Sequence, residues 1–345
     1  MEQSLGNKPI VFRSKYNFST YHNAFVSLGM NTGNMVFLEA LKKLLDVQEM
    51  TFDEYIKRQD EFPDNKIVTT DLIWITQNGN FDYLAKQLDQ MKYQSMIPIS
   101  IGVQASSFDQ DFVLNKSAKE VLARLQDRGV LGVRGEYTAS VLYKNGIKNF
   151  EIIGCPSMYY WNRADFKLLK KSATPQKVTA NFRTFYGLLS IPEKHFLTYC
   201  ANRKFSFVEQ TEHRFSPKNA NDDKYFAYVN HWIEDNNNVF FNINDWMKYM
   251  KGFDFSIGGR FHGNILALWN GIPALFCLVD ARTEEMVRWF HLPYIKMSEF
   301  DDRKSIDEYY DLADYTEFNR HYEERYEGFR NFLKKAGLDM NNDKL

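Results

Sequence analysis

The chain has few cysteines and almost no net charge, and each shortage argues against a class of protein. Three cysteines stand far apart in 345 residues, at positions 155, 200 and 277, so we expect reduced thiols in apolar surroundings rather than a disulfide framework. The 43 basic and 44 acidic side chains leave a formal net charge of −1. Because this gives no overall positive field, we expect no binding of nucleic acid.

Long hydrophobic runs and several common catalytic motifs are also missing. No stretch reaches about 18 consecutive apolar residues, and the N-terminus lacks a basic segment followed by an apolar one, so the sequence predicts a cytoplasmic protein without a membrane span. The patterns G-x-G-x-x-G, G-x-x-x-x-G-K-[ST], G-x-S-x-G and H-E-x-x-H are absent. Their absence argues against dinucleotide, P-loop, serine-hydrolase and zinc-protease sites, and we expect no metal.

What the chain does have is an alternation of short apolar runs and helical patterns. Runs such as PIVF (9–12) and FEIIGCP (150–156) alternate with helical segments such as 35–45 and 117–129. Strands that alternate with helices of about 10–13 residues are typical of parallel sheets, so we predict the α/β class.

The length and one polar segment predict two domains. A chain of 345 residues is too long for one ordinary core. The segment 167–176 is rich in lysine and contains a proline, so we place the boundary there and predict domains 1–172 and 173–345. The second domain is expected to end in an amphipathic helix over 315–337.

The segment GGRFHGN (258–264) is the strongest candidate for a site. It follows the predicted strand FDFSI and leads into a predicted helix that stops at Gly271 and Pro273. Arg260 and His262 then lie at the carboxyl end of a parallel strand, where α/β proteins bind ligands, and an extended segment would turn both to one side. An arginine at a helix start favours an anion, and a histidine moves protons near neutral pH. The alternative is a capping arginine beside a core histidine.

The surroundings of this segment carry a family resemblance. SIGGRFHGNILALWNGIP followed by LVDARTEE lies between Asp254 and Glu285. Its R-x-H between strand and helix, small-residue helix, G-x-P and acidic strand end resemble the polysaccharide pyruvyl transferase family. The N-terminal half agrees in order, with NTGN before a helix, DLIWITQNGN, a strand ending IGVQ, and VRGEYTASVLYKNGIKNFEIIGCPS.

The resemblance implies an activity and a fold. The activity is transfer of a pyruvyl group from phosphoenolpyruvate to two hydroxyls of a sugar in a surface polysaccharide or its precursor, which forms a cyclic ketal. The fold has two Rossmann-like domains that face a cleft, as in GT-B glycosyltransferases. Phosphoenolpyruvate is then the donor substrate without a further cofactor. The acceptor is a glycan or a lipid-linked sugar, and a lipid carrier would bring the protein to the inner face of the membrane.

The resemblance also implies roles for residues 260–264. Arg260 and His262 form the catalytic pair, in which Arg260 holds the donor and His262 is a donor ligand or the acid/base group. Phe261, Gly263 and Asn264 complete the donor-binding segment, with the ring of Phe261 expected to turn into the core.

The donor carries a carboxylate and a phosphate, so a second cationic group is required. Arg183 ends the predicted strand KVTANFR and is our candidate for it, with an ordinary salt bridge as the alternative.

Other candidates lie at predicted strand ends and loops, and each has a structural alternative. Arg134 either contacts the acceptor or orders a helix start. Asn31 and Asn34 in NTGN either contact the acceptor or a phosphate, or simply form a helix-entry loop. Asp280 and Arg282 either reach the cleft, where Asp280 would face the acceptor, or pair with each other at the surface.

Two departures from the family pattern keep other functions open. Members often have an aspartate where this chain has Cys155, and NTGN lacks the acidic residue that relatives often carry after its glycine. One alternative is a GT-B-type glycosyltransferase that uses a nucleotide sugar, although HGNILALWNG has no carboxylate to hold a ribose. Another is a non-catalytic relative that binds a sugar or an anion.

Overall fold

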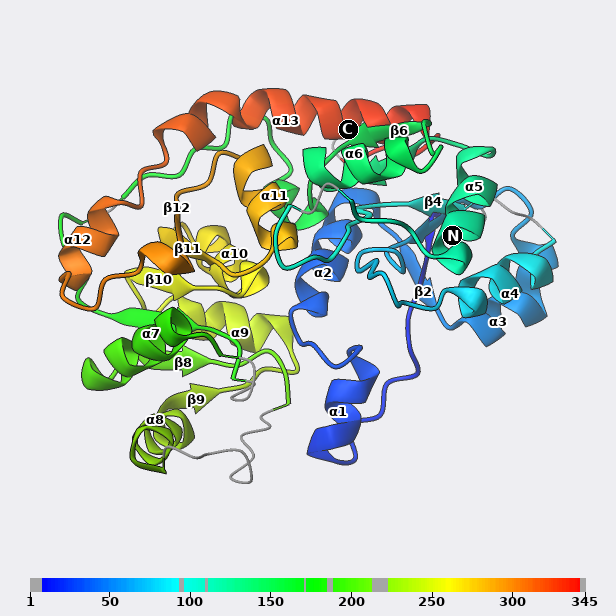
Figure 1. The fold of residues 1–345 in the computed structure, drawn as a ribbon. Helices are drawn as coiled ribbons and strands as arrows, with labels where there is room; N and C mark the ends of the chain where they lie inside the picture. The colour runs from blue at the N-terminus through cyan, green and yellow to red at the C-terminus, as the bar shows by residue number, and fades with distance from the viewer. Residues whose placement is uncertain are drawn as a thin grey trace, which may run out of the picture.

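Two parallel sheets, one from each half of the chain, form the framework of the protein (Figure 1). The computed structural model describes residues 8–92, 96–108, 111–170, 172–184, 189–212 and 223–341.

The first sheet is built from short, buried apolar strands such as IVF and IVT. Four strands pair in the order β2-β1-β3-β4, and β5 and β6 form a second pair. An isolated parallel bridge between Ile101 and Val133 continues the sheet from β4 to β5. The strands are β1 (Ile10–Phe12), β2 (Gln48–Met50), β3 (Ile67–Thr69), β4 (Met96–Pro98), β5 (Leu131–Val133) and β6 (Phe150–Ile152).

The second sheet has the strand order of a Rossmann fold. Its six strands pair in the order β12-β11-β10-β7-β8-β9. When these strands are numbered 1 to 6 along the chain and read from the β9 edge, the order is 3-2-1-4-5-6. Strand order reverses between β7 and β10, and ligands bind beyond the carboxyl ends of strands at such a switch point. The strands are β7 (Val178–Asn181), β8 (Ser206–Val208), β9 (Asn237–Asn238), β10 (Phe255–Gly258), β11 (Ala274–Leu278) and β12 (Tyr294–Lys296).

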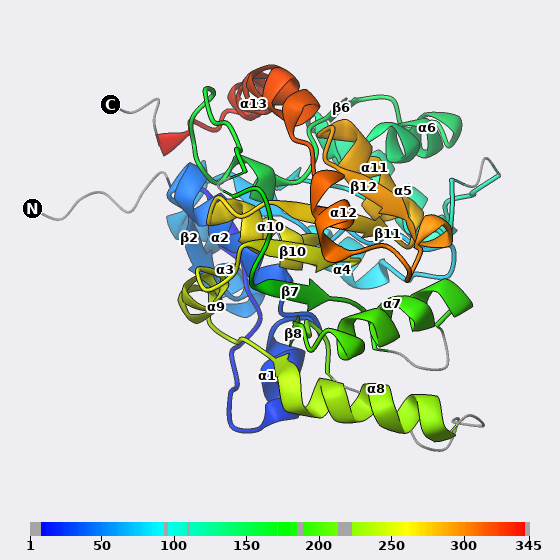
Figure 2. The ribbon, with the colours of Figure 1, turned by 90° about the vertical axis from the view of Figure 1, so that its left-hand side faces the viewer.

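Helices flank both sheets, as two views at right angles show (Figures 1 and 2). The parallel strands require crossover connections, and most of these connections are helical. The first half contributes α1 (Tyr21–Ser27), α2 (Asn34–Leu45), α3 (Phe52–Arg58), η2 (Gln59–Glu61), α4 (Asp82–Gln90), α5 (Lys116–Gln126), α6 (Glu136–Lys144) and η3 (Pro156–Tyr159). The second half contributes α7 (Ile191–Asn202), α8 (Asp223–Asn236), α9 (Ile243–Met250), α10 (Phe261–Trp269), α11 (Ala281–Trp289), η6 (Met297–Glu299), α12 (Ile306–Asp311) and α13 (Thr316–Lys335).

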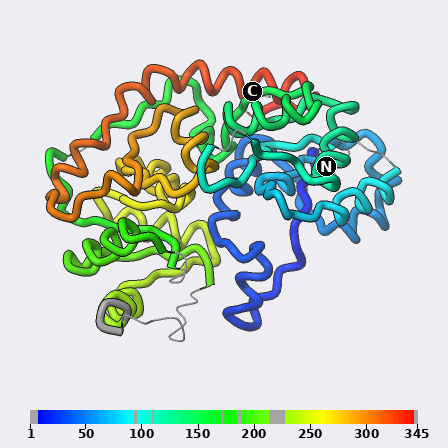
Figure 3. Tube along the Cα trace, viewed as in Figure 1, coloured from blue at the N-terminus to red at the C-terminus, as the bar shows by residue number. Residues whose placement is uncertain are grey.

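The C-terminal helix α13 crosses from the second half back to the first, as the chain trace shows (Figure 3). The ring of Phe329 on α13 stacks on Tyr159 at a centroid distance of 4.4 Å, and Lys335 Nζ pairs with Glu151 Oε1 at 2.6 Å. The predicted boundary after residue 172 falls between β6 and β7, and α13 ties the two sides together.

The expected class, two Rossmann-like α/β units with a C-terminal amphipathic helix, is confirmed. Regular strand pairing is short: it covers only Ile67–Thr69 in the segment 66–77 and only Asn237–Asn238 in the segment 237–243. In the NTGN loop the N-cap of α2 is Gly33, and no side chain caps the helix. No helix in the described ranges is long and apolar enough to cross a membrane.

Candidate functional site

The loop between β10 and α10 is set by a close backbone approach. A Cβ on Gly258 would lie 1.8 Å from the carbonyl oxygen of Asn181 on β7, so only glycine fits at this position. Helix α10 begins at Phe261 and Arg260 is its N-cap. The expectation that Arg260 and His262 share one side of an extended segment was therefore wrong, because His262 already lies in the first helical turn.

A buried polar network holds this loop in place. Asn264 Nδ2 donates to the Gly258 carbonyl at 2.9 Å, and its Oδ1 accepts from Asn181 Nδ2 at 2.7 Å and from Ser256 Oγ at 2.8 Å. These contacts occupy the Asn264 side chain, so we assign it a structural role in place of the expected donor contact. The ring of Phe261 is buried beside Phe276, in the core as expected.

Arg260 is oriented by acidic and hydroxyl groups that follow β8. Its Nη2 donates to Thr211 Oγ1 at 3.0 Å and approaches Glu209 Oε1 at 3.5 Å. Glu209 is fully buried and accepts from the Thr184 hydroxyl at 2.5 Å. Burial lowers the pKa of Arg260 while Glu209 raises it. Among the described residues, the buried Nε of Arg260 has no partner.

His262 is neutral at physiological pH in this structure. Burial and the nearby charges of Arg134 and Arg282 hold its pKa well below 6.5. Its Nε2 lies 3.6 Å from the Sγ of Cys155. The ring also packs against Phe37 at 5.7 Å, so parts of both halves surround the imidazole.

Arg134, which directly follows β5, belongs to the same site. The residue is 1% exposed, and its Nε donates to Ser100 Oγ at 3.2 Å. Gly102 makes room for it, because a Cβ there would lie 2.7 Å from Arg134 Cδ. Burial and the charge of Arg282 lower the pKa of Arg134 to about 10, which leaves it charged. Its Nη1 is buried and has no partner in the described part of the chain.

Asp280 joins the two halves rather than pairing at the surface. It caps α11 by accepting from the Thr283 amide at 2.8 Å, and it accepts from Gln104 Nε2 in the first half at 3.2 Å. Burial opposes its ionisation, but Arg282 and these hydrogen bonds outweigh burial and lower the pKa of Asp280. Arg282 therefore acts on Asp280 electrostatically, and its own Nε is buried and without a partner in the described ranges.

Glu285, one turn further along α11, is a buried acid beside the arginines. Its carboxylate accepts from the amide and the hydroxyl of Thr138 at 2.9 and 2.8 Å. Burial raises its pKa to about 7, against the opposing effects of Thr138, Arg134 and Arg282. A carboxyl group with a pKa near 7 can both hold and release a proton under working conditions.

The remaining predicted residues are engaged in local contacts. Arg183 pairs with Glu193 at 2.5 Å, which matches the alternative of a salt bridge. Asn31 Oδ1 accepts from the Gly33 amide at 2.9 Å, and Asn34 Nδ2 donates to the Leu28 carbonyl at 2.9 Å. A Cβ on Gly33 would nevertheless lie 3.2 Å from His262 Cβ, so the NTGN backbone borders the site while its asparagines shape the turn.

Several residues of this site were not among the sequence candidates. Their only signal was that they follow strand ends or begin the next helix, which is where α/β sites form. They are Gln104, Glu209, Thr211 and Glu285.

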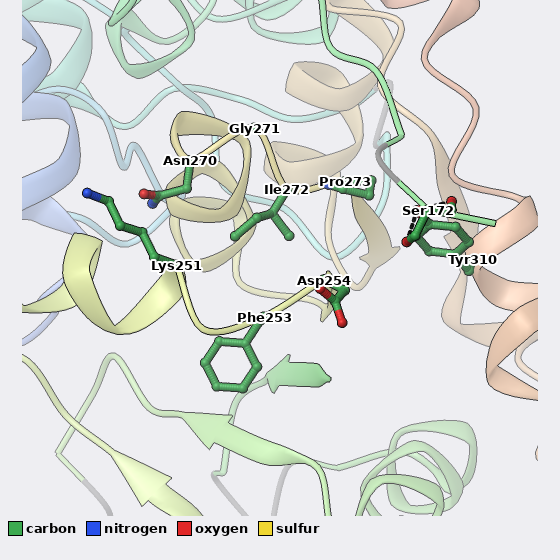
Figure 4. Close-up of a pocket in the computed structure, with 9 residues that line it drawn as sticks. All are labelled: Ser172, Lys251, Phe253, Asp254, Asn270, Gly271, Ile272, Pro273 and Tyr310. Atoms are coloured by element: carbon green, nitrogen blue, oxygen red, sulfur yellow. Dashed lines mark hydrogen bonds between the residues drawn. The ribbon is translucent and has the colours of Figure 1, made fainter. Parts of the chain in front are cut away.

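The pocket in Figure 4 is a different place. It has a volume of about 430 Å³ and is lined by Lys251, Phe253 and Asp254, which precede β10, and by Ile272 and Pro273, which precede β11. It therefore lies at the amino ends of these strands, opposite the arginines.

Nowhere in the described ranges do three or more His, Cys, Asp or Glu side chains gather in a way that could hold a metal ion.

Comparison with solved structures gives distant likenesses. MnaA from S. aureus, solved with UDP, is 11% identical, with 96% of this chain and 94% of that chain covered and a TM-score of 0.43. A putative UDP-N-acetylglucosamine 2-epimerase from Listeria monocytogenes is 9% identical over 96% and 94%, with a TM-score of 0.45. A functionally uncharacterised protein from Klebsiella pneumoniae is 11% identical over 82% and 88%, with a TM-score of 0.39.

Comparison of sequences is more informative. Curated proteins give no match. The sequence model named "Polysaccharide pyruvyl transferase" matches residues 31–280, a span that runs from the NTGN loop through Arg134, Arg260 and His262 to Asp280. This span is most of the chain, and the chain therefore belongs to the polysaccharide pyruvyl transferase family.

Proposed function

We propose that the protein transfers the pyruvyl group of phosphoenolpyruvate to two hydroxyls of a sugar, in a surface polysaccharide or its precursor, to form a cyclic ketal. One observation carries the proposal. Three arginines, Arg134, Arg260 and Arg282, each have a buried nitrogen without a partner in the described part of the chain. The charge of Arg282 lowers the pKa of Arg134 and of Arg260, and Arg134 and Arg282 together lower the pKa of His262. Buried donors of this kind are normally satisfied, so an anion is the expected occupant.

The charge of the donor matches this cluster. Phosphoenolpyruvate carries a carboxylate and a phosphate, and arginine binds both with paired hydrogen bonds. Glu209 offsets part of the positive charge of Arg260, and Asp280 offsets part of the positive charge of Arg282. A positive surplus remains for the donor, with Arg134 and Arg282 available to a second anionic group in place of the predicted Arg183.

Donor binding prepares His262 for proton transfer. The imidazole is neutral while two guanidinium groups repel its proton. A bound anion cancels this repulsion and raises the pKa of the imidazole. The protonated ring then delivers its proton to the methylene carbon of the donor as a sugar hydroxyl adds to the neighbouring carbon. The first hydroxyl gives its proton to the imidazole as its oxygen bonds to that carbon. A second hydroxyl then attacks the same carbon, the carbon–oxygen bond to phosphate breaks, and the proton of the second hydroxyl leaves with the phosphate.

Two further parts of the proposal concern partners and location. The acceptor is a glycan or a lipid-linked sugar, handled on the cytoplasmic side of the membrane. Phe18, Tyr21 and Val26, at and beside α1, are 54%, 49% and 50% exposed, and we place a peripheral membrane contact there. Flotation with liposomes tests this contact, and equal flotation of Phe18→Ser and unaltered protein would exclude this surface.

Product formation tests the activity. We would incubate the protein with phosphoenolpyruvate carrying ¹³C at carbon 2 and with lipid-linked or methyl glycosides, and follow the label by NMR. The proposal predicts a ketal carbon signal and an equal amount of released phosphate, both lost in His262→Gln. Transfer from a UDP-, GDP- or CMP-sugar instead would support a glycosyltransferase. Binding without turnover of any donor would support a non-catalytic relative.

A further inference from the structure

A second hollow lies on the first half, next to the arginine cluster. It has a volume of about 300 Å³ and is lined by Thr76, Gln77, Asn78, Gln104 and Ser106, among others. The parallel bridge between residues 75 and 103 joins its two walls. The lining residues directly follow that bridge, so the hollow lies at a strand-end edge of the first sheet.

Contacts connect this hollow to the donor site. Gln104 Nε2 donates to Asp280 Oδ2 at 3.2 Å, and the Ala281 amide donates to the Ala105 carbonyl at 3.1 Å. Arg282 is the next residue and influences the pKa of both Asp280 and His262. A ligand in the hollow is thus separated from the arginine cluster by Asp280 and its hydrogen bond.

The chemistry of the lining suits hydroxyl groups without charge. Its polar side chains are amides and hydroxyls, and none of the lining residues is ionisable. Gln104 Oε1 is buried without a partner in the described ranges, so it can accept a hydrogen bond from a ligand hydroxyl. The Asp280 carboxylate stands behind Gln104 and would repel an acidic ligand.

An exposed aromatic residue stands two positions before the first residue that lines the hollow. Trp74 is 60% exposed while Ile75, which forms the bridge, is fully buried. Because residues two apart in an extended segment point the same way, we infer that the Trp74 ring is on the side of Thr76, which lines the hollow. A large indole left in water beside amide groups offers an apolar face and hydrogen bonds together, as one face of a sugar ring requires.

We propose that this hollow is the acceptor subsite, and that it selects an uncharged sugar whose ring packs on Trp74 while Gln77, Asn78 and Gln104 bind its hydroxyls. The inference rests on the proposed function, because the subsite is placed beside the phosphoenolpyruvate site so that two hydroxyls of the bound sugar can reach the donor.

Fluorine NMR of protein labelled with 5-fluorotryptophan tests binding directly. The chain has six tryptophans, and the resonance of Trp74 is identified by its loss in Trp74→Phe. The probes are the methyl glycosides of glucose, galactose and mannose, with methyl glucuronoside as the charged comparison. We expect at least one neutral glycoside to shift the Trp74 resonance and the glucuronoside to leave it in place. Ligand-detected NMR should show dissociation constants about tenfold higher in Trp74→Ala, and unchanged in Tyr143→Ala, an exposed ring on α6.

The same samples separate the two proposals. A titration with phosphoenolpyruvate alone reports the donor site. Sugar binding that depends on Trp74, without any response to phosphoenolpyruvate, would leave the subsite standing and remove the proposed donor. A Trp74 resonance that no neutral glycoside moves, even well above millimolar concentrations, would overturn the subsite. Equal shifts by the glucuronoside would overturn its selectivity for uncharged sugars.

Discussion

At the scale of single residues, burial shifts the pKa values of two titratable groups beside the arginines in opposite directions. Burial favours the neutral form of each, so the pKa of Glu285 rises to about 7 while the pKa of His262 falls well below 6.5. Near neutral pH the carboxyl group is therefore partly protonated, while the imidazole is neutral.

Glu285 gives the protein a pH-dependent stability with a definite sign. Its pKa is raised from 4.5 in the unfolded chain to about 7 in the folded protein, so the folded state binds the proton more tightly between these values. The contribution to stability is complete below about pH 4.5 and is lost as the pH rises through 7, by about 3 kcal/mol in total. Urea unfolding at pH 5 and pH 8 should show this loss in the unaltered protein and not in Glu285→Gln. An identical pH dependence in both proteins would show that Glu285 titrates normally.

His262 should respond to the donor rather than to pH alone. Its lowered pKa predicts a neutral imidazole between pH 6 and 8 in the free protein. In the proposed complex, phosphoenolpyruvate would place negative charge beside Arg134 and Arg282 and so raise that pKa. Nitrogen-15 NMR of the histidines, with His262 assigned by His262→Gln, measures both states. A midpoint near pH 6.5 without ligand would contradict the buried, arginine-flanked environment.

At the scale of elements, the turn from β10 into α10 positions Arg260 and His262, and close packing fixes its shape. The sequence predicted this strand and helix correctly because glycines mark both helix ends: Gly258 has no room for a Cβ, and Gly271 has a φ of +68°. The Ile272 amide donates to the Ala267 carbonyl at 3.0 Å, which closes the helix with a Schellman motif. Helix α10 begins directly after Arg260, so His262 lies in a helical turn and not in the extended segment that the sequence predicted.

A pair of glycine substitutions tests how tightly α10 is held. A Cβ on Gly263 would lie 2.7 Å from Gln210 Nε2 and 2.9 Å from Asn181 Cγ, so Gly263→Ala should cost about 1–3 kcal/mol of unfolding free energy. Gly328 lies within α13 with nothing inside 4 Å of its Cβ position, and Gly328→Ala should stabilise by about 0.5–1 kcal/mol. Denaturant unfolding measures both. A neutral Gly263→Ala would mean that the turn is not closely packed.

The middle of the chain shows why some elements escaped prediction. Helix α7 buries Phe196, Leu197, Tyr199, Cys200 and Ala201 on several sides, so it lacks the polar face that gives a helical pattern its period. Strand β8, which follows, is three residues long. Glu209 and Thr211 come directly after it, so the groups that orient Arg260 lie in the part of the sequence with the weakest pattern.

At the scale of the whole molecule, the site exists only because both halves contribute to it. Arg134, Gln104 and Cys155 come from the first half, while Arg260, His262 and α11 come from the second. Sequence alone could place each residue at a strand end but could not bring the two edges together, since no local pattern encodes contacts such as Gln104–Asp280.

Helix α13 makes the two halves depend on each other for stability. Phe329 is fully buried and stacks on Tyr159 of the first half. Phe329→Ala should cost about 3–5 kcal/mol of unfolding free energy, whereas Leu169→Ala, at a position 69% exposed, should change it by less than about 0.5 kcal/mol. Chemical denaturation followed by fluorescence measures both. A small effect of Phe329→Ala would show that α13 is not a structural tie.

The central claim is that Arg134, Arg260 and Arg282 form a site for phosphoenolpyruvate, and ligand-dependent thermal stability tests it most directly. A ligand at 100 times its dissociation constant stabilises the native state by about 2.7 kcal/mol, which raises the melting temperature by a few degrees. We predict this rise with phosphoenolpyruvate for the unaltered protein and for Arg163→Ala, whose side chain pairs with Asp165 and is 58% exposed. We predict its loss in Arg260→Ala and Arg282→Ala, each compared with its own ligand-free melting temperature. An equal rise in all four proteins, or a rise only with a nucleotide sugar, would contradict the account.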